Sequence, residues 1–232
     1  MSLQVVDRLG WADAMTLLNA VIGVVAMAAA VLGEVQLVAQ LILLAAVADG
    51  LDGIIARRYG GTPVGPYLDS MADIVSFGTA PALFIFVAAR EEWTDEALTL
   101  ADDPAFLAIA VGVASLFVVL SLVRTALYTV HVGEDENRPG IQNTLASSIL
   151  AAAYLAGLTY LPALLAVSVV LSVLMVAPVA YPKLLARDAL VMGVVQMGAI
   201  LFPLALERVF PRVLLVFALA YLVLAPRFYW GD

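Results

Sequence analysis

Long apolar runs, separated by short polar stretches, follow one another along the whole chain. About 20 consecutive apolar residues are enough to cross a bilayer as a helix. Eight candidate spans have this character: residues 14–33, 36–58, 66–89, 104–131, 142–160, 162–180, 188–206 and 210–228. No soluble domain fits between them. The pattern therefore predicts an all-α, polytopic membrane protein with about eight transmembrane helices, in which residues 1–232 form a single membrane domain.

Basic residues between the spans predict how the helices are oriented, because cytoplasmic loops carry an excess of lysine and arginine. If the N-terminus is cytoplasmic, the inner side carries Arg8, Arg57, Arg58, Arg138, Lys183, Arg187 and Arg227. The outer side then carries Arg90, Arg208 and Arg212. This imbalance favours a multi-pass protein of the cell membrane with both termini cytoplasmic, and it places the 58–66 loop at the cytoplasmic face.

Composition limits the chemistry that the chain can perform. It is 64% hydrophobic and contains no cysteine and a single histidine, His131. Thiolate chemistry is excluded, and a metal site would consist of oxygen ligands, which suit Mg²⁺, Mn²⁺ or Ca²⁺. The net charge is −8, with many acids in the stretches 90–103 and 133–139, and we expect no nucleic-acid partner. A halophilic source is one hypothesis for these acids and the single lysine; ordinary acidic loops encoded by a GC-rich genome are the other.

Four aspartates stand where the second span ends and the third begins. Asp49 and Asp52 are three residues apart, and Asp69 and Asp73 are four apart, so each pair shares one helix face. The link at 59–65 is rich in glycine and proline, which indicates a tight turn between antiparallel helices. We therefore expect the four carboxylates to converge on one place near the cytoplasmic surface.

Unpaired carboxylates at membrane depth repel one another and are costly to desolvate. Arg57 and Arg58 are too few to neutralise them and point elsewhere on the helix. The cluster therefore predicts one or two divalent cations, Mg²⁺ or Mn²⁺, that also bind phosphate oxygens. The alternative is a set of solvated helix ends with structural salt bridges, which four acids at these spacings disfavour.

Small residues accompany the acids. Gly53, Ala56 and Gly65 could leave room for a flat group between the helices. Close helix packing through small residues, which is common in membranes, is the alternative explanation.

These residues together resemble the signature of the CDP-alcohol phosphatidyltransferases. The pattern is Asp49-x2-Asp52-Gly53-x2-Ala56-Arg57-x7-Gly65-x3-Asp69-x3-Asp73, with seven residues in a spacer that the family usually writes as eight. "TLLN" (16–19) is similar to the family's first-helix motif, although Ala12 and Asp13 replace its usual Pro-Asn. "DSMADIVSFGTAPAL" (69–83) and, more loosely, "RPGIQNTLAS" (138–147) and "MVAPVAYPKL" (175–184) resemble the branch that uses L-serine.

The resemblance implies displacement of CMP from a CDP-linked lipid by an alcohol. It implies that Asp49, Asp52, Asp69 and Asp73 bind the metal, and that Asp73 is also the general base. The residues that it implies for binding the CDP-lipid are Thr16, Asn19, Asp52, Gly53, Ala56, Arg57, Thr62 and Gly65. It also implies a homodimer. The donor would be CDP-archaeol in an archaeon and CDP-diacylglycerol in a bacterium.

Candidate contacts for the acceptor are polar residues near the inner ends of later spans. Arg124 lies within an apolar stretch, which makes it a functional candidate, although its side chain could instead reach the headgroups. The other candidates are Gln142, Asn143, Lys183 and Arg187, of which the two basic residues could simply be inner flanks. The resemblance favours L-serine, whereas these residues equally allow glycerol phosphate or inositol phosphate. An ion-coupled transporter is the remaining alternative, because such proteins also use intramembrane carboxylates.

Overall fold

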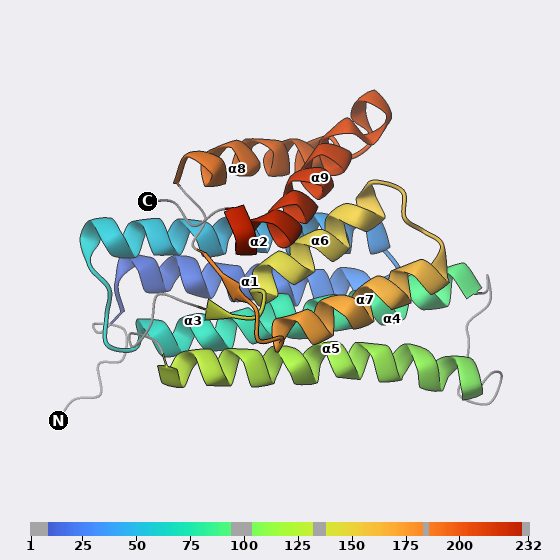
Figure 1. The fold of residues 1–232 in the computed structure, drawn as a ribbon, viewed down its shortest axis with the longest axis horizontal. Coiled ribbons are helices and arrows are strands. Elements are labelled where there is room, and N and C mark those ends of the chain that lie inside the picture. The colour runs from blue at the N-terminus through green and yellow to red at the C-terminus, as the bar shows by residue number, and fades with distance from the viewer. Residues whose placement is uncertain (1–8, 94–103, 132–137, 183–185, 229–232) are drawn as a thin grey trace.

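The computed structural model describes residues 9–93, 104–131, 138–182 and 186–228, and most of its helices lie along one long axis (Figure 1). The elements are α1 (Trp11–Val31), α2 (Val35–Tyr59), α3 (Gly65–Asp73), η2 (Ile74–Thr79), α4 (Ala80–Trp93), α5 (Pro104–His131), β1 (Arg138–Pro139), α6 (Asn143–Leu155), α7 (Leu161–Met175), β2 (Ala180–Tyr181), α8 (Ala186–Leu201) and α9 (Ala205–Phe228). The predicted all-helical architecture is confirmed, with one small exception. β1 and β2 form a two-stranded antiparallel pair with Arg138 opposite Tyr181.

The helices of the described residues include 5 that are long and apolar enough to cross a membrane. They are Trp11–Val31, Val35–Tyr59, Gly65–Arg90, Pro104–Val130 and Ala205–Phe228. Three shorter apolar helices occupy the other predicted spans: Asn143–Leu155, Leu161–Met175 and Val191–Leu201. The molecule is thus a multi-pass membrane protein by length and composition, whereas eight full crossings and cytoplasmic termini stay predictions.

The fifth and sixth spans are shorter than predicted, because local chemistry ends both helices early. Gly157 adopts a φ of 109° just after α6, a conformation that favours glycine and stops the helix. Pro162 then stands in the first turn of α7, where proline is well tolerated, so a short turn joins α6 to α7. After Met175 the chain turns and enters β2, whereas the sequence predicted helix to residue 180.

The third span contains a π-helical segment that the sequence did not predict. η2 joins α3 to α4 directly after Asp73, and two serine hydroxyl groups tie it to α6 and α1. Ser147 of α6 donates to the Phe77 carbonyl (3.0 Å), and Ser76 donates to the Asn19 carbonyl of α1 (2.9 Å). Such π-segments occur often at functional sites.

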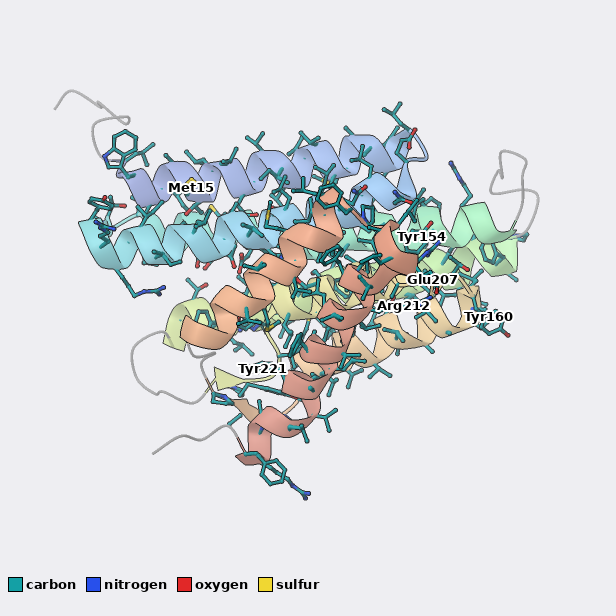
Figure 2. The ribbon with its side chains drawn as sticks, turned by 90° about the horizontal axis from the view of Figure 1, so that it is seen from above. Met15, Tyr154, Tyr160, Glu207, Arg212 and Tyr221 are labelled. Carbon is teal, nitrogen blue, oxygen red and sulfur yellow. The ribbon has the colours of Figure 1, made fainter. Side chains whose placement is uncertain are left out.

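The last two helices lie against the outside of the bundle (Figure 1) and cross it obliquely in the view from above (Figure 2). α8 is joined to α2 by two amides: Gln40 donates to the Ile200 carbonyl (2.5 Å), and Gln196 donates to the Leu43 carbonyl (2.7 Å). α9 packs on α6 and α8. The predicted seventh and eighth spans are therefore two helices of one hairpin docked on α2 and α6.

Candidate active site on α2 and α3

Three of the four signature aspartates converge. The start of α1, the turn between antiparallel α2 and α3, and the end of α5 lie at the same end of the bundle (Figure 1). Asp49 from α2 and Asp69 and Asp73 from α3 each bring one carboxylate oxygen to within 4.8 Å of the other two. All three side chains are half-buried. The convergence predicted from the 3- and 4-residue spacings is therefore present in this acidic trio.

The acidic trio fits a hard divalent cation. The carboxyl groups of Asp49 and Asp73 are close enough to hydrogen-bond to one another. Asp73 Oδ1 is buried and has no hydrogen-bond partner among the described residues. A buried carboxylate oxygen without a donor is costly, and Mg²⁺ and Mn²⁺ prefer carboxylate oxygens. Asp49, Asp69 and Asp73 are thus the residues that could hold the ion.

Asp52 has a different environment from the trio. It is 8% exposed, and Thr16 of α1 donates a hydrogen bond of 2.6 Å to its Oδ2. Asp52 is also close enough to Asp69 to interact electrostatically with it. A hydroxyl donor at this distance holds one carboxylate oxygen in place, so Asp52 borders the trio with its orientation fixed by α1.

Asp13, which the sequence showed only as a departure from the family motif, organises the start of α1 and the α2–α3 turn. Its Oδ2 accepts hydrogen bonds from the Gly10 backbone N–H (2.7 Å) and from the Thr62 hydroxyl (2.8 Å). The Thr62 oxygen in turn accepts from the Gly65 N–H (3.1 Å). A Cβ on Gly65 would lie 3.1 Å from Asp13 Oδ1. Thr62 and Gly65, predicted to contact the CDP-lipid, therefore pack against the protein itself.

The other predicted CDP-lipid contacts line the same end of the bundle. A Cβ on Gly53 would meet only the Arg57 guanidinium, at 3.5 Å, so this face of α2 is open among the described residues. Ala56 is half-buried and Arg57 is exposed. Asn19 is fully buried, and both polar atoms of its amide lack a hydrogen-bond partner among the described residues. An unpaired buried amide is unusual in a folded protein and is consistent with a ligand-binding role.

The predicted acceptor contacts lie in four different surroundings. Arg124 of α5 is 7% exposed, lies over the Tyr128 ring at 4.9 Å, and interacts electrostatically with Asp73. Asn143 is buried in the α5–α6 interface, where its amide nitrogen donates to the Thr125 hydroxyl (2.7 Å). Gln142, directly before α6, lines a pocket beside the site. Lys183 and the side chain of Arg187 lie outside the described residues.

Sequence reasoning missed two hydroxyl contacts that support the aspartates. Thr144 of α6 donates to Asp49 Oδ2 at 3.3 Å, and Ser147, one turn further, holds η2 next to Asp73. Hydroxyl groups in an otherwise apolar helix are the only signal that could have pointed to them. Their partners are 95 and 70 residues away in the chain, so no local pattern could identify the contacts.

Comparison with known proteins agrees with this geometry. The family model of the CDP-alcohol phosphatidyltransferases matches residues 9–179. The chain is 29% identical over 174 residues to the archaetidylserine synthase of Methanothermobacter thermautotrophicus, a match covering 74% of this chain and 69% of that protein. It is 38% identical over 82 residues to the CDP-diacylglycerol–serine O-phosphatidyltransferase of Mycobacterium bovis, covering 35% of this chain and 29% of that one.

The enzyme with that same name from Methanocaldococcus jannaschii is 39% identical over 75 residues, which is 32% of this chain and 34% of that one. The family match spans the acidic trio, Asp52 and the helices that carry them. The chain, a transferase of phospholipid biosynthesis, belongs to the CDP-alcohol phosphatidyltransferase family.

Proposed function

We propose that this protein transfers the phosphatidyl or archaetidyl group of a CDP-linked lipid to the hydroxyl of L-serine and releases CMP. The observation that carries the chemistry is the acidic trio, formed by the signature aspartates of two neighbouring membrane helices. The support for serine comes from the relatives, which are named as serine or archaetidylserine synthases.

Asp49, Asp69 and Asp73, with Asp52 beside them, would hold one or two Mg²⁺ or Mn²⁺ ions. When bound, the metal neutralises charge on the diphosphate and on the departing CMP. Thr16 and Thr144 keep two of these carboxylates in fixed orientations from α1 and α6. The chain itself thus provides a preorganised set of oxygens, which costs little rearrangement during the reaction.

The transfer step forms one bond and breaks one. The serine hydroxyl oxygen attacks the phosphorus that carries the lipid, while the bond from that phosphorus to the bridging diphosphate oxygen breaks and CMP leaves with the electron pair. Asp73 accepts the proton of the hydroxyl as general base. η2 follows Asp73 directly, so the hydroxyls of Ser76 and Ser147 position this carboxylate through the backbone.

The remaining candidates bind the two substrates. Asp52, Gly53, Ala56 and Arg57 contact the nucleotide side of the CDP-lipid, with Thr16 and Asn19 at its diphosphate. Thr62 and Gly65 act by shaping the turn beside it.

On the acceptor side, Arg124 pairs with the serine carboxylate, because a buried guanidinium beside Asp73 is placed to do so. Gln142 and Asn143 shape the acceptor side at the start of α6.

We also propose that the site faces the cytoplasm, with both termini on that side. This arrangement lets the lipid chains stay in the bilayer while water-soluble serine and CMP enter and leave. The expected homodimer stays a prediction.

The test is an acceptor panel with the product lipid identified. Purified protein receives CDP-diacylglycerol or CDP-archaeol, Mn²⁺ or Mg²⁺, and one of L-serine, glycerol 3-phosphate or inositol 1-phosphate. We expect CMP and a serine lipid only with L-serine, and neither in Asp73→Asn nor with a chelator. If CMP and a new lipid form only with a phosphorylated acceptor, the transferase chemistry stands and the proposal that serine is the acceptor is wrong. No CMP with any acceptor, from folded protein at low and high salt, would contradict the transferase and favour a transporter.

A further inference from the structure

A pocket of about 170 Å³ lies where the last two helices cover the bundle. It is bounded by α2, α6, β2, α8 and α9, so part of its wall comes from helices beyond residue 179, where the family match ends. Its polar lining residues are Gln142, Thr144, Ser148, Tyr181, Gln196 and Tyr221. The volume is well above the ~10–15 Å³ that one water needs, so a molecule of several heavy atoms fits.

The pocket adjoins the acidic trio. Thr144 lines it and also donates its hydroxyl hydrogen bond to Asp49 at 3.3 Å. Ala46, another lining residue, precedes Asp49 by three residues on α2 and therefore shares its helix face. Thr144 therefore contacts both the pocket and one carboxylate of the trio.

The outer wall is fixed by polar contacts. The Tyr181 hydroxyl donates to the Leu222 carbonyl of α9 (3.2 Å), and the Tyr221 hydroxyl donates to the Pro182 carbonyl (2.5 Å). Figure 2 places Tyr221 on the side of α9 that faces the strand pair. The ring centroids of the two tyrosines are 6.3 Å apart. These reciprocal bonds hold α9 against β2, so the pocket is a built feature of the fold.

The lining favours one kind of ligand. None of the described residues that line the pocket is charged, and half of them carry an amide or a hydroxyl. Amide and hydroxyl oxygens accept hydrogen bonds from an ammonium group, and tyrosine rings attract cations. A phosphate group instead requires arginine or lysine partners. The pocket therefore suits a small molecule with an ammonium group better than a phosphorylated one.

We propose that the α8–α9 hairpin completes the acceptor site, and that this pocket receives the ammonium end of a small zwitterionic amino alcohol whose hydroxyl points to the acidic trio. This inference rests on the proposed function and adds to it a structural reason for the choice of acceptor. Gln196 is the α8 residue that ties the hairpin to α2 and also lines the pocket, which makes it the residue to test.

The chain offers a matched pair of variants. Gln40 and Gln196 each donate one amide hydrogen bond between α2 and α8, and only Gln196 is among the pocket's lining residues. CMP release is measured for Gln196→Leu and Gln40→Leu in two titrations. In the first, L-serine is varied at saturating CDP-lipid, and in the second, CDP-lipid is varied at saturating L-serine. We expect Gln196→Leu to raise the KM for serine about tenfold, as for loss of a hydrogen bond to a charged group. Its KM for CDP-lipid, and both constants of Gln40→Leu, should stay within twofold of wild type.

Two further measurements sharpen the test. 3-Hydroxypropionate has the hydroxyl and carboxylate of serine and lacks the ammonium, so its inhibition constant should be unchanged in Gln196→Leu. If Gln196→Leu does not fold, Ala218→Met fills the pocket from α9 without changing a polar group, and it too should raise the KM for serine alone.

Three results would overturn the proposal. Equal effects of the two glutamine variants would mean that Gln196 only docks α8. A raised KM for CDP-lipid would assign the pocket to the donor, and an unchanged KM for serine would leave it without a substrate. If the wild-type protein releases no CMP with serine, the proposed function is wrong, and this inference fails with it.

Discussion

Gly23 sets how closely α1 approaches η2, and Gly23→Ala tests whether that close packing positions Asp73. A Cβ at Gly23 would lie 2.5 Å from Ser76 Oγ and 2.9 Å from Ser76 Cα. Real Cβ atoms essentially never come closer than 3.0 Å to such neighbours. Rotation of the Ser76 side chain moves only the hydroxyl, so the backbone of η2 must shift as well.

The magnitude follows from this displacement. Overpacking of this kind costs about 1–3 kcal/mol of stability. A catalytic group displaced by about 1 Å can lose about 100-fold in rate. Asp73 is three residues from Ser76 on the same continuous helix, and we expect a shift of roughly half that size to lower kcat about tenfold.

The assay is CMP release together with thermal unfolding in detergent, and Gly112→Ala is the control. A Cβ at Gly112 in α5 meets nothing within 4 Å, so this variant should keep full activity and gain about 0.5–1 kcal/mol of stability. The double variant Gly23→Ala with Ser76→Ala should recover only part of the loss, because the new methyl group still clashes with the backbone of residue 76. If Gly23→Ala has the same rate and melting temperature as Gly112→Ala, the claim that close packing of α1 on η2 positions Asp73 is wrong.

Three further substitutions test the supports of the site. Thr16→Val removes the 2.6 Å hydrogen bond to Asp52; we expect kcat/KM for CDP-lipid to fall about tenfold or more, and a change below twofold would contradict the role of α1. Thr144→Val removes the longer 3.3 Å hydrogen bond to Asp49; the Mn²⁺ concentration for half-maximal activity should rise about threefold, and an unchanged metal titration would count against this interaction. Arg124→Gln should raise the KM for serine with little effect on the KM for CDP-lipid, and equal changes in both would remove Arg124 from the acceptor site.

The acidic trio could be predicted because its determinants are local. Helical spacing places Asp49 with Asp52 and Asp69 with Asp73, and the glycines and proline of 59–65 bring the two helices together. The roles of Thr62 and Gly65 could not be predicted in the same way, because Asp13, which contacts both, lies 49 residues from Thr62 in the chain.

The π-segment and the short helices were missed for related reasons. η2 depends on hydrogen bonds that the hydroxyl groups of Ser76 and Ser147 donate to carbonyl groups across helix interfaces. A hydropathy pattern does not reveal such hydrogen bonds. Apolar residues continue past Leu155 and Met175, so hydropathy extended α6 and α7 too far, whereas Gly157 and the strand pair decide where they end. The pocket under α8 and α9 could not be predicted from the sequence, because its lining residues come from five separate elements.

The most direct test of the central claim is Mn²⁺ binding to the purified protein, followed by the electron paramagnetic resonance signal of the free ion. The wild type should bind one or two ions, and Asp69→Asn should weaken binding about tenfold or more, because it removes one carboxylate of the trio. Glu34→Gln, an exposed residue before α2, removes the same charge elsewhere and should bind as the wild type does. If Asp69→Asn binds Mn²⁺ as tightly as Glu34→Gln, the trio is not the metal site and the account of the mechanism fails.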